Sequence, residues 1–286
     1  MIWQAVRARL VFGKRSAIGC RRLAVPGIMM LICGAVLAGC AGRAPEPRAT
    51  GPGPVSKPGW QAAIGRVEVK GSHQDCTGVL IRPDVVLTAA HCLHPKGVLV
   101  SASQVSFVSS SASVAEASGV ALLAQGGEVP QGKIGRDLIP FDWAAIRVAP
   151  VKFVTPIPIA PMSLDQAMNE IARGAKFYSA GYGQGSKDRL RPHERCSLLP
   201  AESAELAAIY FTSSCVVRLG DSGGPVALVK GNKPRLIGLI VGFDPRPNIG
   251  APVGFIAPAS AFAPYLNAPV ISHVASPGQT PEMSMN

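Results

Sequence analysis

From Trp60 onward the chain consists mostly of short apolar or alternating runs separated by turn residues. Glycine (31) and proline (26) are frequent, which favours strands joined by turns over long helices. Apolar residues make up 48% and charged residues 16%, so the chain can bury a core. This pattern predicts an all-β sandwich or barrels. The expected strands are 62–69, 78–81, 85–87, 98–101, 105–108, 120–124 and 143–148, then 176–180, 209–212, 225–229, 235–241 and 254–256.

A proline-rich stretch over 150–161 separates these strands into two halves of similar size. We therefore expect one unit at 60–152 and a second at 153–271. Between their strands, residues 163–172 are expected to form a short helix, with Ser163 as its cap.

The first 39 residues have the composition of an export signal. A basic stretch ending at Arg21-Arg22 is followed by an apolar run, and small residues then precede Cys40. The apolar run, about 17 residues long, is at the lower limit for a membrane span. Residues 40–59 are rich in proline and glycine, which is typical of a flexible tether. Residues 272–286 are similar and are expected to be disordered.

The end of this signal, Leu37-Ala38-Gly39-Cys40, resembles that of bacterial lipoproteins. The resemblance implies that Cys40 is acylated and becomes the mature N-terminus. Two or three acyl chains would then hold the protein durably on a bilayer. Ala41, where an acid could stand, implies the outer membrane of the bacterial envelope, facing the periplasm or the cell surface. The alternative is an ordinary secretory signal or an uncleaved anchor, with Cys40 incidental.

The formal charge of +11 does not indicate nucleic-acid binding, because its distribution is uneven. Without the signal, the chain has 22 basic and 17 acidic residues, so its net charge is +5, and the basic residues are scattered along it. No dense basic helix or stripe remains, so nucleic acid is not an expected partner. Nothing in the sequence indicates a metal, an organic cofactor or an oligomeric state.

Of the seven cysteines, Cys20 and Cys33 leave with the signal and Cys40 is the expected lipid site. An even number remains in an exported chain, which implies two disulfides with three possible pairings. A zinc site is the competing use, but no Cys-x-x-Cys pair supports it. The remaining cysteines are Cys76, Cys92, Cys196 and Cys215.

Three segments carry the chemistry. Residues 87–92 read Leu-Thr-Ala-Ala-His-Cys, 141–146 read Phe-Asp-Trp-Ala-Ala-Ile, and 220–225 read Gly-Asp-Ser-Gly-Gly-Pro. In this order they resemble the trypsin/chymotrypsin family, with its T-A-A-H-C, D-x-A and G-D-S-G-G-P signatures. The resemblance runs from about residue 64 to 266. It implies two antiparallel β-barrels, chymotrypsin-like, with the active site in the cleft between them.

The resemblance also implies a serine endopeptidase that cleaves protein or peptide substrates. Ser222 would be the nucleophile, His91 its base and Asp142 the acid that orients the base. The N–H groups of Gly220 and Ser222 would hold the oxyanion. Asp137 is a rival acid, but it lacks the following x-Ala and apolar strand. The remaining histidines have no matching context and are expected on the surface: His73, His94, His193 and His273.

The resemblance favours a disulfide between Cys76 and Cys92, beside His91. Closing a loop of about 15 residues would stabilise the chain by roughly 3 kcal/mol in the loop-entropy model. By elimination, Cys196 would pair with Cys215. The family also braces this region with a disulfide, but with a cysteine nearer the serine, where this chain has Arg218.

The sequence departs from the digestive members of the family in its activation segment. No Ile-Val-Gly-Gly occurs, and the nearest match, at 63–67, has no basic residue immediately before it. We therefore expect activity without zymogen cleavage, and a different partner for Asp221 than a new chain end.

The substrate pocket departs as well, since no carboxylate stands at its base. Cleavage after small or medium apolar residues is expected, because an unpaired buried cation would be costly. The alternative is an inactive relative that binds peptides or a partner protein, or an envelope lipoprotein with a scaffold role. The expected pocket residues are Val216, Val217, Leu219, Val241 and Phe243.

Overall fold

The computed structural model describes residues 59–72, 75–111, 116–127, 136–184, 189–201, 203–244 and 253–266. The expected signal peptide, Cys40, nearly all of the tether and the C-terminal tail lie outside the described residues, as do His73 and His273. In the part of the chain that is described, no helix combines the length and hydropathy that a membrane crossing requires.

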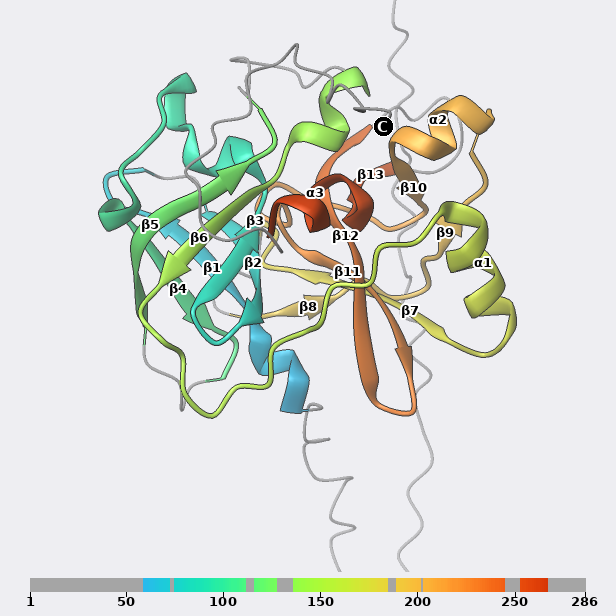
Figure 1. Ribbon diagram of the computed structural model, residues 1–286, viewed down its shortest axis with the longest axis horizontal. Coiled ribbons are helices and arrows are strands. Elements are labelled where there is room, and N and C mark those ends of the chain that lie inside the picture. The colour runs from blue at the N-terminus through green and yellow to red at the C-terminus, as the bar shows by residue number, and fades with distance from the viewer. Residues whose placement is uncertain are drawn as a thin grey trace, which may run out of the picture. The chain divides into compact units, whose positions relative to one another are not determined.

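The first half of the described chain forms a closed antiparallel barrel (Figure 1). Its strands follow one another around the barrel in the order β1-β2-β3-β6-β5-β4. Alternate residues of β4 are buried, whereas every residue of β3 is buried. The barrel strands are β1 (Ile64–Val69), β2 (Asp75–Arg82), β3 (Val85–Thr88), β4 (Val105–Ser109), β5 (Ala117–Gln125) and β6 (Ala144–Val148).

The second half forms a seven-stranded antiparallel sheet in the order β8-β7-β11-β12-β13-β10-β9, curled into a half-barrel. The all-β, two-barrel expectation is confirmed, with the difference that the short end strands β8 and β9 do not pair within the described residues. The strands are β7 (Lys176–Gly181), β8 (Arg191–Pro192), β9 (Leu198–Leu199), β10 (Phe211–Ser213), β11 (Pro225–Lys230), β12 (Lys233–Asp244) and β13 (Val253–Pro258).

Helices are short and lie outside the sheets. The expected helix is α1 (Leu164–Ala172), where Ser163 Oγ accepts the Gln166 N–H at 3.2 Å. The α-helices α2 (Ala204–Ile209) and α3 (Ala259–Leu266) were not expected. Five short 3-10 helices complete the set within the described ranges: η1 (Gly59–Ala63), η2 (Ala90–Leu93), η3 (Pro95–Gly97), η4 (Ala102–Gln104) and η5 (Arg136–Phe141).

Two strand predictions were wrong. Residues 98–101 form no strand but connect η3 to η4. Val98 and Leu99 are 66% and 43% exposed, and within this run Val100 is the valine that packs against the core. The strand expected over 209–212 starts only at Phe211, because Ile209 ends α2, whose N-cap Ser203 accepts the Leu206 N–H.

Helix α3 joins the two halves close to the second motif. Trp143 of the first half is buried at 1% exposure, and its ring lies 6.0 Å from that of Phe262 and 5.5 Å from that of Tyr265. An Arg82 guanidinium nitrogen donates to the Leu266 carbonyl at 3.1 Å. The C-terminal helix therefore fixes the segment that precedes β6.

Candidate active site

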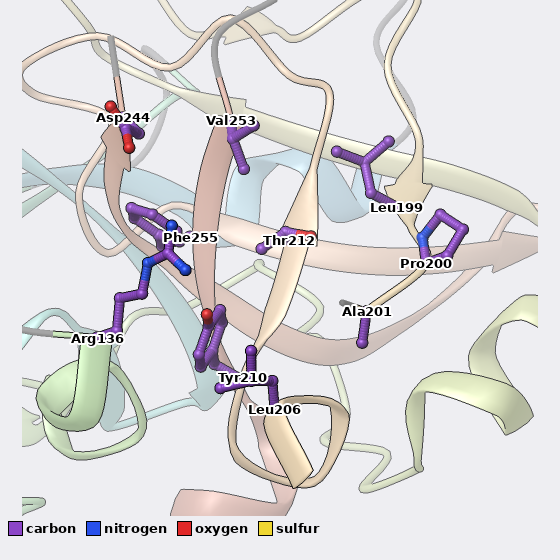
Figure 2. Close-up of a pocket in the computed structure, with 10 residues that line it drawn as sticks. All are labelled: Arg136, Leu199, Pro200, Ala201, Leu206, Tyr210, Thr212, Asp244, Val253 and Phe255. Atoms are coloured by element: carbon purple, nitrogen blue, oxygen red, sulfur yellow. The ribbon is translucent and has the colours of Figure 1, made fainter. Parts of the chain in front are cut away.

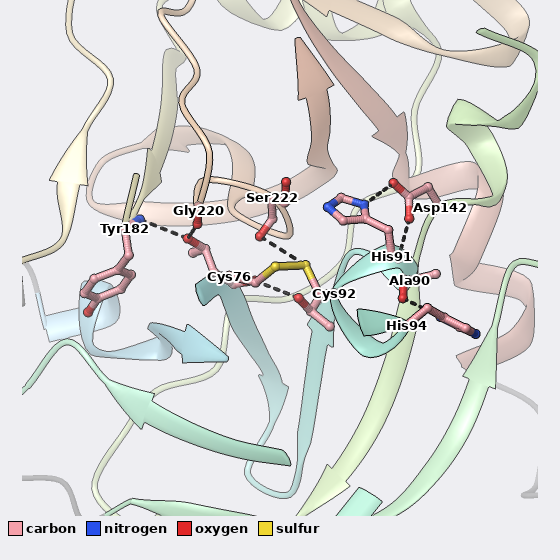
Figure 3. The surroundings of a disulfide bond; sticks show 11 residues. Cys76, Ala90, His91, Cys92, His94, Asp142, Tyr182, Gly220 and Ser222 are labelled. Atoms are coloured by element: carbon pink, nitrogen blue, oxygen red, sulfur yellow. Dashed lines mark hydrogen bonds and ion pairs between the residues drawn. A yellow bond between two sulfur atoms is a disulfide. The ribbon is translucent and has the colours of Figure 1, made fainter. Parts of the chain in front are cut away.

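The His91 segment follows β3 directly and forms the tight turn of η2 (Figure 3). Cys92 in this turn is joined to Cys76 of β2, which confirms the first disulfide. The bond ties η2 to the barrel, while the His91 side chain stays 21% exposed. The backbone of His91 is therefore fixed, while its imidazole ring remains accessible from outside the barrel.

Asp142 is buried at 2% exposure and uses both carboxylate oxygens on His91. The His91 backbone N–H donates to Oδ1 at 2.9 Å, and the ring Nδ1 lies 2.7 Å from Oδ2. A carboxylate oxygen can only accept, so Nδ1 carries the hydrogen and Nε2 of the neutral ring keeps its lone pair. The structure places Asp142, and not the exposed Asp137 of η5, on the imidazole.

The serine loop between β10 and β11 depends on two glycines with positive φ, Gly220 (+102°) and Gly223 (+80°). A Cβ on Gly223 would collide with the Thr77 carbonyl oxygen and the Thr88 hydroxyl. The loop is fastened to both halves of the molecule. The Thr77 N–H donates to the Ser222 carbonyl at 2.8 Å, and the Gly223 N–H donates to the Ile240 carbonyl at 2.7 Å.

Figure 3 shows the His91 ring between Asp142 and Ser222, with the ring nitrogen that Asp142 does not contact on the serine side. The Ser222 carbonyl oxygen lies 3.9 Å from Cys92 Sγ, so the serine loop rests on the disulfide beside His91. The N–H groups of Gly220 and Ser222 donate to no other described residue. They are therefore available to an acceptor from outside the chain.

Thr77 is a fully buried contact of this loop that the sequence did not reveal as such. Its hydroxyl donates to the Gly220 carbonyl at 2.8 Å and accepts the Tyr182 N–H at 2.9 Å. Thr88 Oγ1 in turn donates to the Thr77 carbonyl at 2.8 Å. The Thr77 side chain of the first barrel thus holds the peptide group of Gly220, although the two residues are 143 positions apart in the sequence.

Asp221 is buried at 2% exposure, and its carboxylate accepts three donors. The Gly183 and Arg218 N–H groups each lie 2.7 Å from it, and His193 Nε2 lies at 3.1 Å. The expectation that Asp221 has another partner is confirmed. The expectation that His193 lies on the surface is wrong, because its side chain is 8% exposed.

The segment compared with an activation sequence belongs to the barrel. Ile64 is fully buried and begins β1, where it pairs with Val79 of β2. Gly65 beside it pairs with Gly78 and with Ser109 of β4. A cut at residue 64 would therefore remove the chain that leads into a barrel strand.

The expected pocket residues differ in exposure. Val217 and Val241 are buried, whereas Val216 and Leu219 are 56% and 62% exposed. Val216 was expected at the pocket floor, and the structure does not bury it. A Cβ on Gly254 would lie 2.9 Å from Val217 Cγ2, so this glycine leaves room beside Val217.

A separate pocket lies where η5, which leads into Asp142, faces the second sheet (Figure 2). Asp244, which ends β12 directly after Phe243, is at its rim. Most of its lining is apolar, and Arg136 and Asp244 are its charged lining residues (Figure 2). The lining residues are Arg136, Leu199, Pro200, Ala201, Leu206, Tyr210, Thr212, Asp244, Val253 and Phe255.

A closed barrel, a curled second sheet, and a His–Asp pair beside a glycine-rich serine loop define the chymotrypsin-like class of serine proteases. The chain matches the Trypsin family over residues 52–266, which is most of its length, and it belongs to that family. It is a serine endopeptidase with a trypsin-like fold and two disulfides, the second joining Cys196 to Cys215.

A structural comparison agrees with the fold. The chain is similar to a thermostable serine protease, AL20, from an extremophilic microorganism, with a TM-score of 0.51. The match has 19% sequence identity and covers 73% of this chain and 97% of the other. At that identity the likeness supports the fold alone. A search of curated proteins found no match.

Proposed function

We propose that the protein hydrolyses peptide bonds with His91, Asp142 and Ser222 as its catalytic residues. The observation that carries this proposal is that the Asp142 carboxylate accepts hydrogen bonds from both the backbone N–H and the Nδ1 of His91. These two bonds leave the His91 Nε2, on the side of Ser222, to act as the base.

The reaction follows from these positions. Ser222 Oγ attacks the scissile carbonyl carbon while His91 Nε2 takes its proton. The oxyanion accepts hydrogen bonds from the Gly220 and Ser222 N–H groups, each worth about 3–4 kcal/mol of barrier in comparable sites. His91 then gives its proton to the leaving amine as the C–N bond breaks. A water molecule releases the acyl group by the same steps.

Proteolysis is tested by turnover of a denatured protein substrate. Wild-type enzyme should release peptides, and Ser222→Ala should reduce kcat by several orders of magnitude. Ser103→Ala is the matched control, because this exposed serine lies in η4 on the first barrel. Equal turnover by Ser222→Ala and wild type would contradict the proposal.

We further propose that the residue before the cleaved bond is small or medium and apolar. Val217 and Val241 offer buried apolar surface, and Gly254 leaves space beside Val217. The Asp221 carboxylate, directly before Ser222, is already engaged by three donors and cannot serve a basic side chain. The pocket of Figure 2 would bind another residue of the substrate, one that lies N-terminal to the residue before the cleaved bond. The enzyme's cleavage of a peptide library measures this preference. Strict cleavage after basic residues would contradict the proposal of an apolar residue before the cut.

The last part of the proposal is that Cys40 carries lipid and tethers the enzyme to the bacterial outer membrane. Its support is the sequence Leu37-Ala38-Gly39-Cys40 behind a basic and apolar stretch. Cys40→Ser should abolish metabolic labelling with a fatty acid and move the enzyme out of the membrane fraction. Cys33→Ser, inside the apolar run, is the control. Unchanged labelling of Cys40→Ser would contradict the tether.

A further inference from the structure

The Asp221 carboxylate is a buried charge directly before Ser222, and folding removes it from water. A buried carboxylate is costly unless its oxygens accept hydrogen bonds or it has a cationic partner. Two of its donors are backbone N–H groups of Gly183 and Arg218. The third is the side chain of His193, which among the described residues is the one donor to Asp221 that a substitution can remove.

The His193 ring is fixed on both edges. Its Nε2 lies 3.1 Å from Asp221 Oδ2, so Nε2 carries a hydrogen that it donates. Its Nδ1 lies 3.0 Å from Ser179 Oγ, a hydroxyl that can donate to a neutral ring or accept from a charged one. The His193 N–H also donates to the Ser179 carbonyl at 2.8 Å. Ser179 of β7 therefore sets both the backbone and the ring.

Two features of the chain deliver His193 to this place. Strand β8 pairs with β7, with Pro192 opposite Ala180, and the ring of the next residue, His193, reaches Asp221 in the serine loop. The Cys196–Cys215 disulfide then joins the His193 segment to the segment that leads into Arg218. The same bond places Cys196 Sγ 3.3 Å from the His193 carbonyl.

We propose that His193 is a positioning residue that holds the loop of residues 218–222 in its working shape through Asp221. It does so from inside the folded chain, with no chain end created by cleavage. Asp221 lies between Gly220 and Ser222 in the chain, so fixing it would also fix the two N–H groups that are proposed to hold the oxyanion. This inference rests on the proposed function for its kinetic consequence, but the contact itself can be tested separately.

The kinetic test compares two substitutions of similar size. His193→Gln keeps an N–H donor within reach of Asp221, whereas His193→Met keeps the volume but has no donor. Loss of a hydrogen bond to a charged group predicts a kcat/KM about 10-fold to 100-fold lower for His193→Met. His193→Gln should lose less than about fivefold by the same reasoning. Glu194→Ala, an exposed neighbour, is the control and should match wild type.

Equal activities of the Gln and Met variants would overturn the proposal, because they would mean that the hydrogen bond does not hold the loop. Thermal unfolding of each variant separates this effect from a folding defect. A gain of full activity in His193→Met upon proteolysis near residue 64 would also overturn it.

A second measurement does not depend on activity. In wild-type protein labelled with ¹⁵N-histidine, the His193 Nε2–H should give a slowly exchanging signal, assigned by its loss in His193→Gln. Absence of that signal would overturn the contact. A wild-type protein with this signal but without turnover would contradict the proposed function and leave the His193–Asp221 contact standing.

Discussion

Two buried aspartates, Asp142 and Asp221, each hold a histidine, yet the two pairs have different tasks. Asp142 contacts His91 on one ring edge, and the other edge lies towards Ser222. Asp221 contacts His193, whose second ring nitrogen is already bonded to Ser179. A base must have a nitrogen available to the reacting group, so of these two histidines we assign proton transfer to His91 in the proposed mechanism. His193 can only fix its partner.

At the residue scale, Asp142→Asn should reduce kcat by about 10⁴-fold, because an amide in place of the carboxylate favours the wrong tautomer of His91. Asp137→Asn is the control, since Asp137 is exposed and does not contact His91. Steady-state kinetics of both variants checks this. Comparable losses in the two would contradict the assignment of Asp142.

A second residue-scale prediction concerns the buried Thr77 hydroxyl. Thr77→Val keeps the shape but leaves the Gly220 carbonyl and the Tyr182 N–H without their partner. We expect a loss of about 1–3 kcal/mol in the free energy of unfolding and a lower kcat/KM. Thr77→Ser keeps the hydroxyl and should stay close to wild type. Denaturant unfolding and kinetics together measure both effects.

At the scale of elements, the strands that carry alternating apolar residues were predictable, because one face of each is buried. Residues 98–101 were not, since the side chains of Val98 and Leu99 stay exposed and only Val100 packs against the core. The three motifs made the His91, Asp142 and Ser222 segments recognisable. His193 was not recognisable, because its role arises from the β7–β8 pairing and a disulfide rather than from its neighbours in sequence.

The two disulfides should contribute equally to stability but differ in their effect on His193. Their separations of 16 and 19 positions predict a similar stabilisation, about 3 kcal/mol each in the loop-entropy model. Replacing Cys196 and Cys215 by serine should also loosen His193, and thus exchange of its Nε2–H should become faster. Replacing Cys76 and Cys92 should lower stability without that change in exchange. NMR exchange rates and melting temperatures distinguish the two outcomes, and identical exchange in both variants would contradict the link to His193.

At the scale of the whole molecule, the two halves are joined through aromatic contacts. Trp60 of η1 packs edge-on against Tyr178 of β7 at 4.8 Å between ring centroids, and its Nε1 donates to Asn232 Oδ1. Gln61 Nε2 donates to the Tyr178 hydroxyl at 3.1 Å. The first half contributes His91 and the second contributes Ser222, so these contacts set the distance between the two.

Burial at this junction predicts a loss of stability in alkali. Desolvation raises the pKa of Tyr182 to about 12, and burial also raises the pKa of Tyr178. Both phenols stay neutral in the folded chain while the unfolded chain ionises near its ordinary pKa of about 10. Their contribution is therefore fully present below about pH 10 and is lost as the pH rises towards 12.

For Tyr182 alone, the raised pKa predicts that the free energy of unfolding is lower by about 1 kcal/mol at pH 11 than at neutral pH. Urea unfolding at pH 9 and pH 11 measures the difference. Tyr182→Phe should show a smaller decrease than wild type between these two pH values, and an equal decrease would contradict the effect of burial.

The central claim is that Ser222 is the nucleophile of an enzyme that needs no cleavage at residue 64. Its most direct test is labelling of the purified chain from Cys40 onward with a fluorophosphonate, followed by mass spectrometry of the labelled peptide. We expect one phosphonylated residue, Ser222, in uncleaved protein, and no labelling of Ser222→Ala. Labelling at another serine, or labelling that appears only after cleavage near residue 64, would contradict it.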